Sequence, residues 1–120
     1  MKITKIEKNN KVCAVVNNTQ KIITDVQSAL DLLMTVNYEA ETKNIAISKE
    51  LITDDFFILS TCLAGEILQK FINYGVRIAI YGDYSKYTSK ALKDFIYESN
   101  NGKDVFFVST ENEAIECLTR

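Results

Sequence analysis

The pattern of hydrophobic and polar positions changes period along the chain, and the changes predict where strands and helices lie. Short apolar runs bounded by polar residues predict five strands, at 3–8, 12–16, 44–47, 76–81 and 105–108. Apolar residues spaced three and four positions apart predict four helices, at about 24–37, 61–74, 91–100 and 110–118. The predicted order is two strands, a helix, and then three strand–helix pairs.

This order predicts an α/β fold in a single domain, residues 1–120, built on a mixed but mostly parallel sheet with helices packed on it. Asn9 and Asn10 separate the first two strands. Asparagine tolerates left-handed backbone angles, so a β-hairpin is expected there, adding an antiparallel edge to the sheet. No long linker, repeat or low-complexity tract divides the chain.

Two of the helices carry signals that predict their limits. Thr24 is expected to cap the first helix, with Gln27 completing a capping box and Asn37 ending it. The buried face of that helix is predicted to consist of Val26, Ala29, Leu30, Leu33 and Met34. Gly75 follows the second helix directly, at the position where a left-handed residue is common.

Charge and hydropathy exclude several classes of partner. The net charge of −2 and the pI of about 5.2 argue against a general nucleic-acid binder, which is usually basic. No apolar run approaches the roughly 20 residues that a membrane helix needs. Lysines interrupt the start of the chain, which lacks the apolar segment of a signal peptide. We therefore expect a cytoplasmic protein with neither a nucleic-acid nor a membrane partner.

The cysteine and histidine content limits the chemistry. Cys13, Cys62 and Cys117 are widely spaced and form no CxxC pair, so they are expected to be reduced and mostly buried thiols. The chain has no histidine, which removes the commonest general base near neutral pH and the commonest metal ligand. We therefore expect no metal and no other cofactor, and no catalytic residue is assigned.

The densest run of functional side chains is the loop 82–90, between the strand 76–81 and the next helix. Ligands of open α/β sheets bind at the carboxyl ends of the strands, and a helix N-terminus suits anions. Hydroxyl groups in the loop can donate hydrogen bonds to a phosphate, with Lys86 or Lys90 as counter-charge. The candidates for binding a ligand or a partner are Asp83, Tyr84, Ser85, Lys86, Tyr87, Thr88 and Ser89.

The same loop also has a purely structural interpretation. Gly82 would permit the turn, Asp83 or Ser85 would cap the helix, and Tyr84 and Tyr87 would pack on the rim of the sheet. An aromatic contact surface is an equally good interpretation of the tyrosines, because protein interfaces favour this residue. The tyrosines concerned are Tyr38, Tyr74, Tyr84, Tyr87 and Tyr97.

Two other places carry reactive or charged side chains. Ser60 and Thr61 precede the second helix and are candidates for phosphorylation, because a phosphate at a helix N-terminus changes the local charge and hydrogen bonding. Capping of that helix is their structural alternative. Asp54 and Asp55 are adjacent carboxylates, which are expected in a solvated loop rather than at an acid/base or metal site.

The middle of the chain resembles the STAS domain (sulfate transporter and anti-sigma factor antagonist). The similar stretch is NIAISKELITDDFFILSTCLAGEILQKFINYGVRIAIYGD, with its strand, loop, amphipathic helix, glycine turn and strand. The resemblance implies a STAS-like sandwich, and a phosphorylated serine in an Asp-Ser-Ser/Thr-Gly-Leu motif at the helix start. Ser60, Thr61 and Leu63 match that motif in kind, whereas Leu59 and Cys62 stand where the family has Asp and Gly.

A second resemblance covers residues 55–118. The run GDYSKYTSKALKDFIYESN, followed by VFFV, is similar to a family of small bacterial proteins of unknown function. This resemblance implies no activity.

These observations favour a non-enzymatic role and leave two hypotheses open. The first is a cytoplasmic interaction or regulatory module that binds a protein partner or a second copy of itself as a homodimer. The alternative is a protein that binds, or acts on, a small anionic or phosphorylated ligand at the loop 82–90. The lack of histidine and of any nucleophile–base pair favours binding over catalysis.

Overall fold

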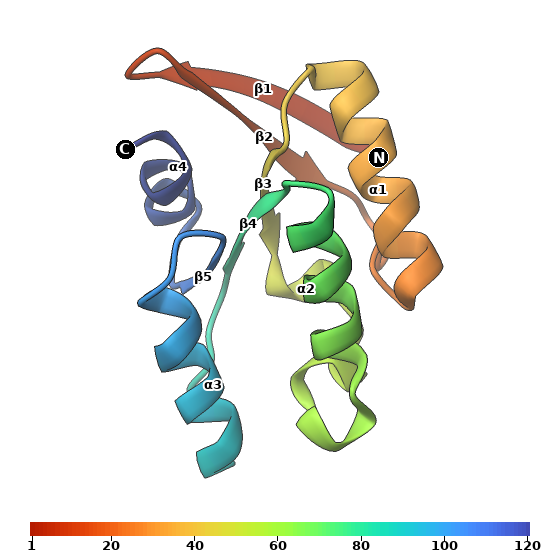
Figure 1. The fold of residues 1–120 in the computed structure, drawn as a ribbon, viewed down its shortest axis with the longest axis vertical. Helices are drawn as coiled ribbons and strands as arrows, with labels where there is room; N and C mark the ends of the chain where they lie inside the picture. Colours follow the sequence, from red (N-terminus) through yellow and green to blue (C-terminus); the bar gives the residue numbers. More distant parts are fainter.

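A five-stranded sheet with helices on both faces forms the framework of the protein, as the computed structural model of residues 1–120 shows (Figure 1). The strands lie side by side in chain order: β1 (Lys2–Lys8), β2 (Lys11–Asn17), β3 (Asn44–Ser48), β4 (Arg77–Tyr81) and β5 (Val105–Val108). The helices are α1 (Val26–Ala40), α2 (Leu63–Asn73), α3 (Lys90–Asn100) and α4 (Glu111–Thr119). Three short 3₁₀ helices, η1 (Lys49–Leu51), η2 (Asp54–Phe57) and η3 (Leu59–Thr61), join β3 to α2.

The sheet is mixed, as predicted. β1 and β2 pair antiparallel across a turn in which Asn9 and Asn10 both have positive φ, so the predicted hairpin is confirmed. β2, β3, β4 and β5 are mutually parallel. The α/β class with an N-terminal hairpin is therefore confirmed. Because the strand order never reverses, this sheet lacks the crevice that a reversal opens in doubly wound folds.

The helices divide between the two faces of the sheet according to side-chain size. Large aliphatic residues of the central strands face the main core, under α1, α2 and α3: Ile45, Ile47, Ile78 and Ile80. Small residues of the same strands face α4 and pack with its apolar side chains: Ala46, Ala79, Ala114 and Leu118. Alternation along each strand thus sorts the residues to two faces, and the alanines let α4 lie close.

All four parallel strands end at the same edge of the sheet, which is the lower edge in Figure 1. There, α1, α2 and α3 begin, and each helix then runs back toward the upper edge. We call these the carboxyl edge and the amino edge. The loop 82–90 leaves the carboxyl end of β4, so it lies at the carboxyl edge, as the sequence predicts.

The start of the first helix differs from the prediction by one residue. Asp25, rather than Thr24, caps α1: its carboxylate accepts the Ser28 N–H at 2.7 Å, and the Asp25 N–H donates to Ser28 Oγ at 3.0 Å. The capping box is therefore Asp25 with Ser28, and Gln27 takes no part. A carboxylate accepts this bond more strongly than a neutral hydroxyl does, which favours Asp25 as the cap.

The end and the buried face of α1 also differ from the prediction. The helix passes Asn37 and ends at Ala40, because this extra turn buries Ala40 against the core. Met34, predicted to be buried, is 53 % exposed. Leu32 takes its place in the core, so the helix is rotated slightly from the orientation that the sequence predicts.

α2 is shorter than predicted, because η2 and η3 precede it. The helix begins at Leu63, after Cys62 in a left-handed conformation (φ 64°), rather than at Thr61. Phe56 and Phe57 are buried and fix these turns against the core, with their ring centroids 5.0 Å apart. At the other end, Gly75 is left-handed (φ 73°), as predicted.

The outer edge of β5 is closed by a side chain. The Asn100 amide donates to the Phe107 carbonyl at 3.0 Å, and its oxygen accepts the Phe107 N–H at 2.7 Å. Asn100 thereby pairs with Phe107 as a neighbouring strand would. This pairing ties the end of α3 to β5 and blocks the addition of another strand at this point.

Replacing this side chain should therefore destabilise the fold. Asn100→Ala leaves the N–H and the carbonyl of the buried Phe107 without these partners, so we expect the free energy of unfolding to fall by about 1–3 kcal/mol. Urea denaturation measures the change. Asn101→Ala, at the exposed end of the same helix, is the matched control, and an equal loss in both variants would contradict this role.

Candidate functional site

The loop 82–90 begins in close contact with the residue that follows β3. Ser48 pairs with Tyr81 in the parallel β3–β4 register, so the next residues, Lys49 and Gly82, lie side by side. A Cβ atom at position 82 would lie 2.8 Å from the Lys49 Cβ, and Gly82 has a φ of 156°. Glycine is therefore required here by the approach of Lys49 as well as by the turn.

The Lys49 side chain fills the space beneath the loop. The residue is only 4 % exposed, and its Nζ lies 5.7 Å from the Phe57 ring centroid and 5.2 Å from that of Tyr87. The Glu50 Oε1 lies 3.5 Å from Nζ. Burial alone lowers the pKa of Lys49, but the Tyr87 hydroxyl and the Glu50 carboxylate outweigh it, so the pKa is raised and the amine stays charged.

Lys49 was not among the residues that the sequence predicted for this site. A lysine directly after a fully buried strand is common and does not by itself indicate a function. The available signal is the register: once β3 and β4 are aligned, Lys49 stands beside Gly82, the first residue of the candidate loop.

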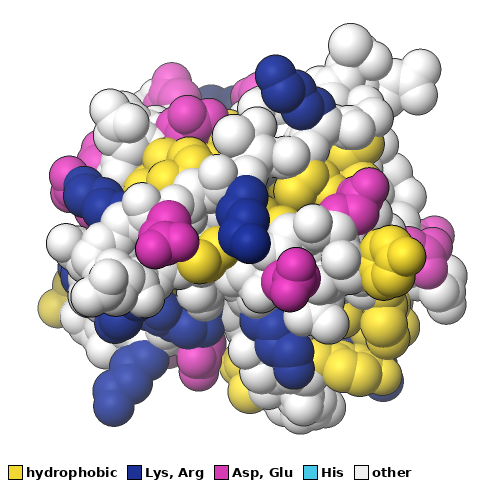
Figure 2. Space-filling model, turned by 90° about the horizontal axis from the view of Figure 1, so that it is seen from above, with side chains coloured by type: hydrophobic (Ala, Val, Ile, Leu, Met, Phe, Trp, Pro, Cys, Tyr) yellow, Lys and Arg dark blue, Asp and Glu magenta, His cyan; other side chains and the backbone are white.

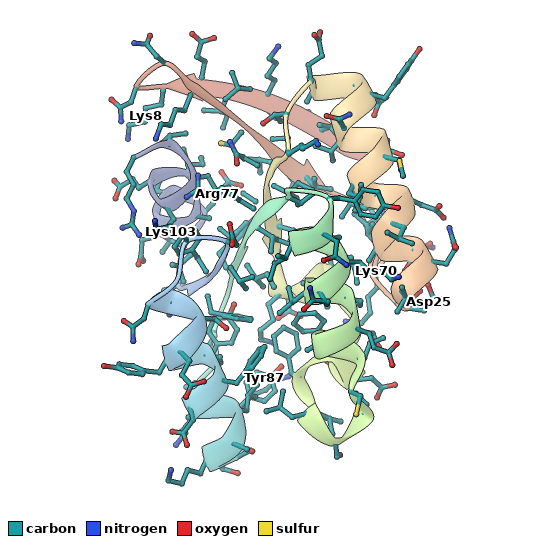
Figure 3. The ribbon with its side chains drawn as sticks, viewed as in Figure 1. Lys8, Asp25, Lys70, Arg77, Tyr87 and Lys103 are labelled. Carbon is teal, nitrogen blue, oxygen red and sulfur yellow. The ribbon has the colours of Figure 1, made fainter.

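The two tyrosines of the loop point inward, which decides between the two interpretations of them. The Tyr84 hydroxyl donates to the Ile80 carbonyl at 2.6 Å, and its ring meets Phe107 edge-on at 5.9 Å. The Tyr87 ring stacks on Phe57 at 5.4 Å and enters the space between α3 and the turns before α2 (Figure 3). The Tyr87 hydroxyl is buried near Lys49 without a hydrogen bond of ordinary geometry. Both residues are packing elements, whereas Tyr38 and Tyr97 are exposed.

The polar residues at the start of the loop stabilise the loop itself. The Asp83 carboxylate accepts the Ser85 N–H at 2.8 Å. Its hydrogen bonds with Ser85, and then the charges of Lys49 and Lys86, lower the pKa of Asp83. Neither Asp83 nor Ser85 caps α3. Ser89 is the cap, accepting the Leu92 N–H at 3.2 Å, because the helix begins only at Lys90.

The second half of the loop borders a hollow of about 470 Å³, which we call the carboxyl-edge hollow. Four polar residues line it: Ser60, Lys86, Thr88 and Ser89. Its apolar lining consists of Phe57, Ile58, Leu59, Tyr87, Ala91 and Leu92. The fold thus brings Ser60, predicted separately from the loop, into one site with four of the predicted loop residues. Asp83, Tyr84 and Ser85 do not line the hollow.

Thr61 has a structural role. Its Oγ1 lies 2.8 Å from both the Asp55 and the Ile58 carbonyl oxygens and accepts the Leu63 N–H at 3.3 Å. The hydroxyl therefore fastens η2 and η3 to the start of α2. Ser60 is exposed, and its hydroxyl has no hydrogen-bond partner within the protein. Of the two predicted phosphorylation candidates, only Ser60 presents a free hydroxyl.

The charge at the hollow comes from Lys86. Its Nζ lies 5.4 Å from the Tyr87 ring centroid and has no carboxylate partner, since the ion pairs of this chain are Lys49–Glu50 and Lys90–Asp94. Hydroxyl groups and an unpaired ammonium thus surround an apolar floor. This combination suits a ligand with an anionic group and an apolar portion.

No three side chains among His, Cys, Asp and Glu gather in a way that could hold a metal ion. Cys13 is buried, Cys117 is half-buried and Cys62 is exposed, and all three are free thiols. None of the helices combines the length and the hydropathy needed to cross a bilayer.

Comparison with known proteins identifies the family. The family model described as Domain of unknown function (DUF4180) matches residues 8–118, and the chain therefore belongs to this family. Searches of curated proteins and of solved structures gave no match. The predicted membership of a small family of unknown function is confirmed, while the STAS resemblance and the bacterial origin stay predictions.

The buried tyrosine of the loop gives a testable dependence on pH. Burial, and then the neighbouring Tyr87, raise the pKa of Tyr84, so the folded state keeps a proton that the unfolded chain releases near pH 10. Stability should fall above pH 10, with up to about 1.4 kcal/mol per pH unit from Tyr84. The pKa of Tyr81 is raised to about 12 by burial and by Glu111, so Tyr81 adds a further decrease of stability above pH 10.

Tyr84→Phe should therefore show a shallower decrease of stability between pH 9 and pH 11 than the wild type. At pH 7 the variant should lose about 1 kcal/mol, because the hydrogen bond to the Ile80 carbonyl is gone. Urea denaturation at each pH measures both effects. Tyr97→Phe, which alters a tyrosine that is 70 % exposed, is the control, and identical slopes in wild type and Tyr84→Phe would contradict the assignment.

Proposed function

We propose that this protein is a non-enzymatic regulatory module that binds a small anionic or phosphorylated ligand in the carboxyl-edge hollow. The observation that carries the proposal is the convergence of Ser60 with Lys86, Thr88 and Ser89 around one apolar floor. These residues come from segments on either side of α2. Its volume of about 470 Å³ lies within the range of small-molecule sites.

The side chains at the hollow favour binding over catalysis. The hydroxyls need a base to become nucleophiles, and the chain has no histidine. Asp83 is the carboxylate of the loop, but its lowered pKa makes it a weaker base, and it is engaged with Ser85. A regulatory role, a cytoplasmic location and a STAS-like arrangement belong to the same proposal. So does phosphorylation of Ser60, which would place an anion beside Lys86.

Ligand binding can be tested by thermal unfolding. Inorganic phosphate, glucose 6-phosphate and AMP, each at about 5 mM, are suitable probes because all three carry a phosphate group and would stabilise the native state on binding. A ligand at 100 times its Kd stabilises the native state by about 2.7 kcal/mol, which should raise the midpoint by roughly 10 °C in a chain of this size. Lys86→Gln should abolish at least half of the shift, because it removes the cation that lines the hollow.

Lys93→Gln removes a charge from an exposed position of α3 and should leave the shift unchanged. No shift with any probe, or an equal loss in both variants, would count against the hollow as the site.

A second candidate function is self-association through α1. Met34 and Tyr38 lie one helical turn apart and are 53 % and 87 % exposed. Apolar side chains gather on the α1 side of the molecule, at the right of Figure 2. The charged residues of α1 are Asp31 and Glu39, with no lysine or arginine. Association there would therefore rest on the apolar contacts of Met34 and Tyr38. Tyrosine and methionine are enriched in such interfaces.

Light scattering tests the homodimer directly. The wild type should show a dimer whose fraction grows with concentration, and Met34→Ser combined with Tyr38→Ser should be monomeric. Tyr97→Ser, an exposed tyrosine on α3, should leave the dimer intact. A wild type that stays monomeric up to about 1 mM would remove this candidate. A Kd of about 1 mM corresponds to an association free energy of only about 4 kcal/mol.

A further inference from the structure

Four basic residues from distant parts of the chain converge at the amino edge of the sheet, opposite to the hollow. Lys11 begins β2, Arg77 begins β4, Lys103 precedes β5 and Arg120 follows α4. Together with Gly102, Asp104 and Phe106 they line a second cavity of about 420 Å³, which we call the amino-edge groove. Figure 3 shows Arg77 and Lys103 beside α4, with Lys8 of the hairpin above them.

Two of these cations, Arg77 and Lys11, donate hydrogen bonds to backbone carbonyls at the end of α4. The Arg77 guanidinium donates to the Cys117, Leu118 and Lys103 carbonyls at 3.3, 3.4 and 2.9 Å. Lys11 Nζ donates to the Arg120 carbonyl at 2.5 Å. Cations are favourable at a helix C-terminus, where the unpaired carbonyls carry partial negative charge. The position of Arg77 and Lys11 therefore has a structural reason.

Neither Lys103 nor Arg120 has a side-chain hydrogen bond or an ion pair. The Arg120 guanidinium lies over the buried Phe106 ring at 5.4 Å, with Arg77 over the same ring at 5.6 Å. None of the four cations forms an ion pair, although the chain has more acidic than basic residues. Asp104 lines the groove without pairing with any of them. Four cations therefore line one groove with no carboxylate at ion-pair distance, in a protein whose net charge is −2.

We propose that the amino-edge groove is a second anion site, which binds a small oligophosphate through Lys103 and Arg120, with Lys11 and Arg77 behind them. A compact ligand with several negative charges matches several cations around one small volume. Arginine matches the geometry of phosphate through parallel N–H donors, and lysine serves as a point charge. This site goes beyond the function proposed above, because it lies at the other edge of the sheet.

Two features favour a small anion over a nucleic acid. The groove is about 420 Å³, the size of a small-molecule site rather than of an extended track. Acidic side chains are interspersed with basic ones on this face of the molecule, as the view from above in Figure 2 shows. A long polyanion lying across this edge would meet like charges outside the groove, whereas an oligophosphate seated within it would not.

Isothermal titration with inorganic tripolyphosphate in low salt tests this proposal. The wild type should bind, and the affinity should fall steeply as salt is raised, because the contacts are between exposed charges. Lys103→Gln combined with Arg120→Gln should weaken binding at least tenfold. Lys70→Gln combined with Lys93→Gln changes the net charge equally at exposed positions elsewhere and should bind as the wild type does. Circular dichroism verifies that both double variants fold.

The outcomes also separate this site from the carboxyl-edge hollow. Lys86→Gln should keep tripolyphosphate binding, and the Lys103/Arg120 double variant should keep the thermal response to the ligand of the hollow. Absence of binding to the wild type would overturn the proposal. An equal loss in both double variants would reduce it to general charge attraction, and a loss confined to Lys86→Gln would move the binding to the hollow.

Discussion

The contact between Lys49 and Gly82 is the constraint on which the carboxyl edge depends. It follows directly from the parallel register of β3 and β4, which sets the residues after Ser48 and Tyr81 side by side. A side chain at position 82 would displace Lys49, since the added Cβ would lie 2.8 Å from the Lys49 Cβ. With glycine there, the lysine can extend beneath the loop, and the loop can close over it. The register of two buried strands thereby determines the position of a surface loop.

The position of the Lys49 ammonium explains why the aromatic residues gather at this edge. A charge removed from water costs several kcal/mol unless other groups replace its hydration. Here the Phe57 and Tyr87 rings, 5.7 and 5.2 Å away, and the Glu50 carboxylate at 3.5 Å supply that replacement. The same two rings stack on each other and form part of the floor of the hollow. One buried cation thus links the end of β3, the turns before α2 and the loop that leads to α3.

The sequence was sufficient for the order of elements and for the class of fold, because these depend on hydrophobic periodicity within each segment. It was less reliable at the ends of α1 and α2, where neighbouring residues compete for the same role. Asp25 is a better acceptor than Thr24, and burial of Ala40 extends α1 beyond Asn37. The candidate loop was found from its composition, but the inward orientation of Tyr84 and Tyr87 was left undecided. Lys49 and the proximity of Ser60 to Lys86 depend on tertiary contacts that no local pattern contains.

The two edges of the sheet differ in how their charges are held, and this difference bears on function. At the carboxyl edge, the buried Lys49 is compensated by aromatic faces and a carboxylate, so it stabilises the loop, while Lys86 remains unpaired at the hollow. At the amino edge, Arg77 is held by three backbone carbonyls, while Lys103 and Arg120 remain without a carboxylate. Each edge therefore combines a cation with a structural role and a cation without one. The unpaired cations line the two cavities, so the anion binding proposed at each edge would use side chains that the fold does not already hold in ion pairs.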